Sequence, residues 1–393
     1  MTTIFGTTKD DTLFDTTGDD LIFGFQGNDT IFGSIGNDIL LGGDGNDFLK
    51  DTSGSNLLYG GSGSDQLYVT GSSNGNLLDG GSGNDNIFVD QGSHSNIING
   101  GSGDDDIFLM ITWGNNIVYG GSGDDQITLY ATTGNDTING GEGNDHITLK
   151  DSSGDHQING GDGNDTIYAF QSQNNNVFLG GNGSDVIILD GIGTTLQSVN
   201  GGNALDSLVL RAVYTQAPLS MQINPNGTAG SINSGTHQIV TFKNIETLYL
   251  NGTNFDDTIS GGNGNDTLAG GNGNDHLTGG KGSDTLTGND GADTFAFNGF
   301  SQGIDVISDF TVASDIISIS EAGFGGGLIA GTLDVDQFVV GSAAATADER
   351  FIYNDATGSL YFDQDGNANG FAQIELVGLA TGLALTSSDF VVV

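Results

Sequence analysis

The chain has 393 residues, a length suited to two or three ordinary domains or to one elongated repeat body. It carries 50 Asp and Glu residues against 7 Lys and Arg, and its formal net charge is −43. This charge disfavours nucleic acid and anionic membrane surfaces as partners, and it opposes a compact state unless something supplies positive charge. The absence of cysteine excludes disulfides and cysteine metal sites, and no apolar run is long enough to predict a membrane span.

A nine-residue repeat begins at Gly6, with units such as DTTGDDLIF, GFQGNDTIF and GGDGNDFLK. The same period returns at Gly252 and continues to about residue 298, with units such as GGNGNDTLA and GGNGNDHLT. The sixth position of the unit is almost always aspartate, and Asn56 is the exception. The aspartates at this position are Asp11, Asp20, Asp29, Asp38, Asp47, Asp65, Asp257, Asp266, Asp275, Asp284 and Asp293.

Between the two nonapeptide arrays the period is twenty residues. The hexamer GGxGxD recurs at 60, 80, 100, 120, 140, 160 and 180, and a degenerate copy, GGNALD, begins at 201. Its aspartates after Asp65 are Asp85, Asp105, Asp125, Asp145, Asp165 and Asp185. Positions 8, 10 and 19 of each unit are apolar. Because alternate residues of a strand share a face, we expect one strand near positions 7–10 and another near 17–20, with 8, 10, 17 and 19 inward.

Each unit is therefore predicted to be one coil of a β-solenoid, which buries its apolar face only by stacking on its neighbours. Stacking brings the aspartates of successive turns close together, where bare carboxylates repel. A hard divalent cation resolves this conflict, and calcium accepts carboxylate and carbonyl oxygens together in flexible geometry. The glycines permit the backbone angles with which a turn aims its carbonyls into one hollow. The alternative is a set of glycine-rich surface turns without metal.

The repeats resemble the RTX (repeats-in-toxin) family, whose nonapeptide GGxGxDxUx forms a calcium-bound parallel β-roll. The full GGxGxD hexamer occurs eleven times, and the resemblance covers roughly residues 6–298. It implies that the sixth-position aspartates and the carbonyls of stacked turns hold several Ca²⁺ ions. Asn56 and the copy at 201–206 depart from the pattern, so we expect weak or empty sites there.

The second turn of each twenty-residue unit departs from the family pattern. These turns read TGSSNG, DQGSHS, MITWGN, YATTGN, KDSSGD and FQSQNN, and none is GGxGxD. We therefore expect calcium along one edge only between about residues 60 and 200. Position 17 is mostly Asn or Asp, and we expect a ladder there to satisfy the turn backbone instead. Its members are Asn76, Asn96, Asn116, Asp136, His156 and Asn176.

The last hundred residues resemble the C-terminal region of serralysin-type RTX proteins, which caps the roll and carries an uncleaved type I secretion signal. The resemblance rests on GADTFAFNGFSQGIDVISDFTVASDIISIS and RFIYNDATGSLYFDQDG, and 389–393 match the acidic-then-hydrophobic ending of that signal. The alternative for 389–393 is a last edge strand. We see no N-terminal signal peptide, which favours this export route. The segment 363–366 resembles an EF-hand loop but lacks its Glu, so a hairpin turn is the better interpretation.

The predicted fold is all-β, a parallel β-roll with a C-terminal β-rich cap. We expect a nonapeptide roll over 1–59, twenty-residue coils over 60–204, an irregular β segment over 205–250, a second roll over 251–298, and a cap with a secretion signal over 299–393.

The predicted function is that of a secreted calcium-binding protein at the cell surface or outside the cell, not an enzyme. It would fold on calcium and serve a structural or adhesive role in a surface layer, biofilm matrix or adhesin. Its expected partners are calcium, the type I secretion machinery, and either further copies of itself or a surface glycan. The alternative is a carbohydrate-active enzyme or glycan-binding module. An outward stripe at position 9, which includes Tyr68, Phe88 and Phe108, would grip a glycan or partner unless other segments cover it.

Overall fold

The computed structural model describes the chain except for residues 72–74, 93–94, 173, 212, 214 and 369. The chain divides into two compact units, Met1–Asp206 and Ser207–Val393. The finer five-part division stays a prediction. No helix in the described part of the chain is long and apolar enough to cross a membrane.

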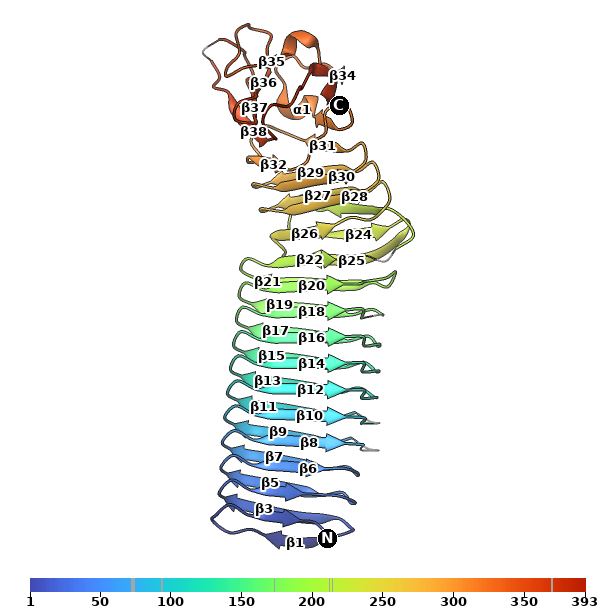
Figure 1. The fold of residues 1–393 in the computed structure, drawn as a ribbon, viewed down its shortest axis with the longest axis vertical. Coiled ribbons are helices and arrows are strands. Elements are labelled where there is room, and N and C mark those ends of the chain that lie inside the picture. The colour runs from blue at the N-terminus through green and yellow to red at the C-terminus, as the bar shows by residue number, and fades with distance from the viewer. Residues whose placement is uncertain (72–74, 93–94, 173, 212, 214, 369) are drawn as a thin grey trace. The chain divides into compact units, whose positions relative to one another are not determined.

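The first unit is a stack of coils in which successive strands alternate between two parallel sheets (Figure 1). One sheet contains β1 (Thr2–Phe5), β3 (Asp20–Gln26), β5 (Ile39–Asp44), β7 (Leu57–Ser62), β9 (Leu77–Ser82), β11 (Ile97–Ser102), β13 (Ile117–Ser122), β15 (Thr137–Glu142), β17 (Gln157–Asp162), β19 (Val177–Asn182) and β21 (Gln197–Asn203). The other contains β2 (Thr12–Phe14), β4 (Thr30–Phe32), β6 (Phe48–Asp51), β8 (Gln66–Thr70), β10 (Asn86–Asp90), β12 (Asp106–Met110), β14 (Gln126–Tyr130), β16 (His146–Lys150), β18 (Thr166–Phe170) and β20 (Val186–Asp190).

Equivalent positions of successive coils lie side by side in both sheets. Ile87 pairs with Ile107 between β10 and β12, and Gly81 pairs with Gly101 between β9 and β11. The side chains at positions 8, 10 and 19 form the core, with Leu67, Val69 and Leu78 fully buried. This confirms the predicted all-β parallel solenoid.

The second strand of each coil differs in its limits from the prediction. It was expected near positions 17–20, but β9 begins at position 18 and continues through both glycines to Ser82 of the next unit. The glycines extend the strand because they pair in register with the glycines of the neighbouring coils. Position 17 still points inward, since Asn96 and Asn116 are fully buried just before their strands.

The second unit also consists mainly of strands in two ladders. Its elements up to the second nonapeptide array are β22 (Ser207–Arg211), β23 (Leu219–Ile223), β24 (Gly230–Ser234), β25 (His237–Lys243), β26 (Thr247–Asn251), β27 (Thr258–Asn263), β28 (Thr267–Asn272), β29 (His276–Lys281), β30 (Thr285–Asp290) and β31 (Thr294–Phe297). The strands β23, β24 and β25 form an antiparallel meander, whereas β27 to β31 return to parallel coils.

The remaining elements form the β-rich ending. They are β32 (Asp305–Ile307), β33 (Ile316–Ile319), α1 (Glu321–Phe324), β34 (Gly331–Thr332), η1 (Val335–Gln337), β35 (Phe338–Val340), β36 (Phe351–Asn354), β37 (Ser359–Phe362), β38 (Ile374–Gly378), η2 (Ser387–Asp389) and β39 (Phe390–Val392). The antiparallel pairing of β37 and β38 places 363–366 in their connection, as the hairpin interpretation requires. β39 is paired on both sides, with β33 and β34, so it is not an edge strand.

Candidate metal centres

The sixth-position aspartates after Asp11 form a ladder in which each carboxylate accepts a backbone hydrogen bond from the segment stacked before it. The backbone N–H of Asp65 donates to Asp85 Oδ1 at 2.7 Å, and the N–H of Asp85 donates to Asp105 Oδ1 at 2.7 Å. The same bond joins the equivalent aspartates of the nonapeptide arrays, as between Asp29 and Asp47 and between Asp266 and Asp284. The stacking of the coils therefore fixes one oxygen of each carboxylate in this ladder.

The second oxygen of most of these carboxylates is buried and has no hydrogen-bond partner among the described residues. This is true of fourteen of the seventeen predicted ligands, namely Asp29, Asp38, Asp47, Asp65, Asp85, Asp105, Asp125, Asp145, Asp165, Asp185, Asp266, Asp275, Asp284 and Asp293. Burial of an unpaired carboxylate oxygen is costly, so a row of them indicates that a positively charged group belongs there.

Most of these oxygens lie in a hollow bordered by backbone carbonyls. A Cβ added to Gly60, at position 1, would collide with Asp65 Oδ2 and would lie 2.5 Å from the carbonyl oxygen of Gly80 in the next coil. A Cβ at Gly83, at position 4, would collide with the Gly63 carbonyl oxygen of the coil before. The glycines are thus required because stacked turns approach each other backbone to backbone around the carboxylate.

Burial raises the pKa of these carboxyl groups because it disfavours the charged form. The pKa of Asp65, Asp85, Asp105 and Asp125 is raised to about 7, and that of Asp47 to about 6. Hydrogen bonds from the backbone oppose this shift, while the charge of the neighbouring aspartate in the ladder adds to it. A bound cation would remove the conflict by pairing with the charged form.

Three predicted ligands, Asp11, Asp20 and Asp257, differ from the others because a threonine at position 2 of their own turn donates to Oδ2. Thr16 donates to Asp20 Oδ2 from its N–H at 2.7 Å and from its hydroxyl at 2.6 Å. These bonds hold the pKa of Asp20 at about 2. Thr7 and Thr253 donate in the same way to Asp11 and Asp257. The second oxygen of these three carboxylates therefore already has donors from the protein, although burial still raises the pKa of Asp257 above its usual value.

The structure also brings aspartates into the ladder that were not among the predicted ligands. Asp305 and Asp315 accept the backbone N–H groups of Asp284 and Asp293, each at 3.0 Å, and both are buried. They lie outside any GGxGxD hexamer, and the remaining signal is the D-x-I spacing shared with the repeats. Asp206 of the degenerate copy at 201–206 accepts the N–H of Asp185 at 2.9 Å, so this copy keeps the ladder geometry.

The donor set suits calcium better than other metals. Most of these hollows offer carboxylate and carbonyl oxygens, the ligands of a hard cation, and Ca²⁺ tolerates the irregular geometry that carbonyls of two stacked turns provide. Zinc and copper prefer nitrogen and sulfur ligands. When bound, calcium would supply the positive charge that lets the carboxylates stay ionised in the fold.

The opposite edge of the twenty-residue coils carries a ladder of amides in place of carboxylates. The N–H of Asn96 donates to Asn116 Oδ1 at 3.0 Å, and Asn96 Nδ2 donates to the same oxygen at 2.8 Å. Asn116 Nδ2 also donates to its own turn, to Thr112 Oγ1 and the Gly114 carbonyl. The amide ladder thus satisfies turn backbone groups on this edge, as predicted, although 72–74, 93–94 and 173 of these turns lie outside the described residues.

The family model of the RTX calcium-binding nonapeptide repeat (4 copies) matches about half of the chain. The matched segments are 5–40, 41–72, 69–93, 112–127, 128–151, 148–169, 249–277 and 269–300. The chain belongs to the RTX calcium-binding repeat proteins. Repeats of this family bind calcium, so the RTX chain binds several Ca²⁺ ions, and which aspartates hold them is our proposal.

Two solved structures illustrate what the RTX chain is similar to. The AlgE6R3 subunit of the mannuronan C5-epimerase from Azotobacter vinelandii is 28% identical, with 37% of this chain and 77% of that chain covered and a TM-score of 0.27. The extracellular lipase LipA from Serratia marcescens is 19% identical, with 67% of this chain and 40% of that chain covered and a TM-score of 0.19. No curated protein matches the chain.

The aromatic stripe on the outer face of the first unit is a stack of rings. Phe14, Phe32, Phe48, Tyr68, Phe88 and Phe108 follow one another with ring centroids 5.3–5.9 Å apart. The rings of Phe88 and Phe108 are nearly parallel, with 5° between their planes. Two of these five contacts are stacked and three are tilted, and such aromatic pairs add to the stability of the coil stack.

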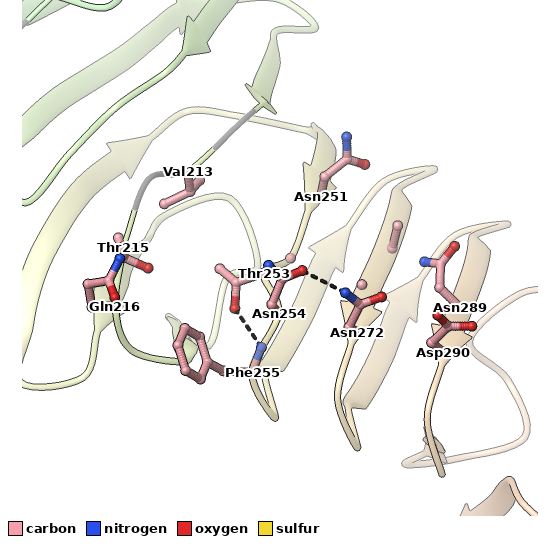
Figure 2. A pocket seen from close by; sticks show the side chains of 13 residues that line it. Val213, Thr215, Gln216, Asn251, Thr253, Asn254, Phe255, Asn272, Asn289 and Asp290 are labelled. Carbon is pink, nitrogen blue, oxygen red and sulfur yellow. Dashed lines mark hydrogen bonds between the residues drawn. The ribbon is translucent and has the colours of Figure 1, made fainter.

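The second unit has a cleft of about 940 Å³ over its second nonapeptide array. Figure 2 shows the amides of Asn251, Asn254 and Asn272 along one side of it and the ring of Phe255 below them. Asn272 Nδ2 donates to Asn254 Oδ1 at 2.7 Å, which orients both amides. The cleft thus combines amide donors and acceptors with one aromatic ring, and Asp290 adds a carboxylate to its lining.

Proposed function

We propose that this RTX chain is a secreted protein that folds when calcium binds outside the cell and then serves a structural or adhesive role in a surface layer, biofilm matrix or adhesin. One observation carries the calcium part: fourteen stacked carboxylates keep a buried oxygen without a partner among the described residues. A chain with net charge −43 cannot pack them at neutral pH without a counter-charge. About a dozen Ca²⁺ ions would offset roughly 24 of these charges.

Calcium binding is then coupled to folding. The hollows exist only when two coils are stacked, so the unfolded chain has no comparable sites, and binding free energy becomes folding free energy. Where calcium is scarce the carboxylates repel and the coils separate. Where it is abundant the coils stack from one turn to the next.

This coupling supports export through a type I secretion machinery. A chain that stays unfolded inside the cell can be threaded, and folding outside prevents its return. Within the segment 389–393, which resembles the family's secretion signal, β39 is paired on both sides in the folded chain. A receptor would therefore read it before folding, when the strand is free.

The structural role is supported by the way the acidic residues are used. The sixth-position aspartates lie in the turn ladder, and the aromatic rings of the outer face contact one another. Both arrangements repeat from coil to coil and stabilise the stack. We therefore propose no catalytic residues for this chain.

Circular dichroism and sedimentation of the purified chain test this proposal, first in EGTA and then in millimolar calcium. We expect β-structure and a compact sedimenting species to appear only with calcium. Equal folding in EGTA would overturn the coupling. Binding of the folded protein to cells of its source, measured with and without calcium, tests the adhesive role separately.

A second candidate, glycan binding, is favoured by the cleft in Figure 2. Its four asparagines, Asn251, Asn254, Asn272 and Asn289, offer donors and acceptors to hydroxyls, and Phe255 offers an aromatic surface. Retention of a panel of neutral polysaccharides by the wild type and by Phe255→Ala would test it. Loss of retention in the variant, with unchanged calcium-dependent folding, would favour this function, and product release from any polysaccharide would show an enzyme.

A further inference from the structure

The turns 15–20 and 51–56 in the first nonapeptide array have aspartate where the other turns of that array have glycine at position 1. These residues are Asp15 and Asp51. The turn that begins at Asp51 also has Asn56 in place of the usual sixth-position aspartate. The turn 51–56 therefore gains a carboxylate at position 1, Asp51, and lacks one at position 6, Asn56.

Asp51 is fully buried, and its Oδ2 has no hydrogen-bond partner among the described residues. Asp38, at position 6 of the neighbouring turn 33–38, is fully buried and has the same unpartnered Oδ2. The two atoms border one space, because a Cβ added to Gly33 would collide with Asp51 Oδ2 and lie 3.5 Å from Asp38 Oδ2.

The equivalent space in the regular turns is bordered differently. At Gly60 the neighbouring coil contributes the carbonyl oxygen of its position-1 residue, Gly80. At Gly33 the neighbouring coil contributes the carboxylate of its position-1 residue, Asp51. Asp51 therefore brings a negative charge to the side of the hollow where other coils bring a neutral oxygen.

Asn56 lacks the charge that its position normally supplies. Its Oδ1 still accepts the N–H of Asp38 at 3.0 Å, so it keeps the ladder bond. Its Nδ2 donates to the Ser53 carbonyl of its own turn at 3.0 Å. The side chain thus completes the backbone ladder as an aspartate does, but it offers a donor where an aspartate offers a second oxygen.

Asp15 shows that an aspartate at position 1 is not sufficient for such a site. Ser34 donates to Asp15 from its N–H at 2.7 Å and from its hydroxyl at 2.9 Å, and Asp15 is only half-buried. Asp15, Asp20 and Asp38 do offer ligand atoms within 4.8 Å of one another, but Thr16 donates to Asp20. Within this described group Asp38 alone keeps an unpartnered buried oxygen, and that oxygen borders the space next to Asp51.

We propose that Asp51 and Asp38 form a calcium site between the turns 33–38 and 51–56, in which the position-1 carboxylate of Asp51 replaces the position-6 carboxylate lost at Asn56. The number of carboxylates shared by the two stacked turns then equals that of a regular pair such as Asp47 and Asp65. The weak or empty site that the motif predicts at Asn56 is thereby converted into a full site. This inference rests on the calcium part of the proposed function and is independent of the structural role.

Native mass spectrometry of the full chain in calcium tests it, because the number of bound ions is read directly. We expect Asp51→Asn and Asp51→Gly each to bind one calcium fewer than the wild type. The double variant Asp51→Gly with Asn56→Asp, which restores the family pattern, should regain that ion. Asp44→Asn is the matched control, since it also removes one carboxylate from the first array but from an exposed position.

Circular dichroism in calcium shows whether each variant is folded, and Asp51→Asn preserves side-chain shape in case the glycine variant is not. An unchanged calcium count in both folded single variants would overturn the inference, as would a double variant that fails to regain the ion. A wild-type chain that bound no calcium would instead refute the calcium part of the proposed function.

Discussion

The backbone N–H of Asp85 donates to Asp105 Oδ1 at 2.7 Å, while Asp105 Oδ2 is buried without a hydrogen-bond partner among the described residues. One oxygen of the carboxylate is therefore held by the protein fold, and we propose that the other binds a cation. Asparagine can take over the first role but not the second, as the amide ladder on the opposite edge shows. The consequences of removing the charge thus depend on whether calcium is present.

For Asp105→Asn we expect a change of sign between the two conditions. In chelator the variant should be more stable than the wild type, by about 1–3 kcal/mol, because an unpaired buried carboxylate oxygen is replaced by a donor that can reach its own turn. In calcium it should be less stable, because a ligand is lost. Thermal unfolding followed by circular dichroism at neutral pH, in EGTA and in calcium, measures both effects, with an osmolyte added to promote folding in EGTA.

Asn116→Asp is the matched control on the opposite edge. It places a carboxylate beside Asp136 and removes three donated bonds, from Nδ2 to Thr112, Gly114 and Asp136. We expect a loss of stability that calcium does not restore, since the turn MITWGN has no carbonyl hollow of the GGxGxD kind. Rescue of this variant by calcium would contradict the assignment of the metal to one edge.

Stability should change with pH in opposite directions with and without calcium. The folded-state pKa of Asp65, Asp85, Asp105 and Asp125 is about 7, above the ordinary value of 3.8. Between these values the metal-free folded state binds more protons than the unfolded state, so its stability is greatest below pH 4 and is lost as pH rises through 7. In chelator we expect β-structure to increase as pH falls from 8 to 5.

With calcium the same protons compete with the metal for the carboxylates. The unfolding temperature should therefore fall as pH is lowered from 8 to 5, because protonation releases calcium. The two series are recorded by circular dichroism at constant ionic strength, since exposed charges also respond to salt. Parallel trends in EGTA and in calcium would show that carboxylates other than the turn ladder dominate the pH dependence.

The fold could be predicted from the sequence because the repeat period encodes it directly. The apolar residues at positions 8, 10 and 19, such as Leu67, Val69 and Leu78, recur with strand alternation and are all buried. A single coil is too small for a core, so the stacking of coils followed from the same pattern. The meander β23–β25 could not be predicted in detail, because the segment that contains it has no repeat from which strand limits could be inferred.

The candidate sites could be predicted from the sequence where the turn follows the GGxGxD motif. By the motif alone, any other residue at a glycine position means a lost calcium site. The motif therefore could not show that Asp51 compensates for Asn56. The motif also does not show that Thr16 donates hydrogen bonds to Asp20, because only the folded turn places the N–H and hydroxyl of a position-2 threonine against the carboxylate. Asp305 and Asp315 were missed because only the coil register, not a hexamer, brings them into the ladder.

Gly83→Ala should destabilise the calcium-loaded chain by about 1–3 kcal/mol, the cost of holding a non-glycine residue in a strained backbone region. Gly83 has φ +114°, and an added Cβ would collide with the Gly63 carbonyl oxygen of the stacked turn. The control is Gly18→Ala, at the same position of its repeat, where an added Cβ meets nothing within 4 Å. Urea unfolding in calcium compares the two, and equal midpoints would show that turn stacking tolerates a side chain.

His156→Asn should stabilise the chain by about 1 kcal/mol at neutral pH, because it restores an interrupted amide ladder. His156 is fully buried, its Nδ1 lies 3.3 Å from Asp136 Oδ2, and its Nε2 has no partner among the described residues. An asparagine would accept the N–H of Asp136 as its neighbours do and would leave no ring nitrogen unpaired. The control is His146→Asn, which changes an exposed histidine on β16 and should have little effect. Thermal unfolding of both variants in calcium measures the difference, and a destabilised His156→Asn would show that the contact between His156 and Asp136 is worth more than the missing amide.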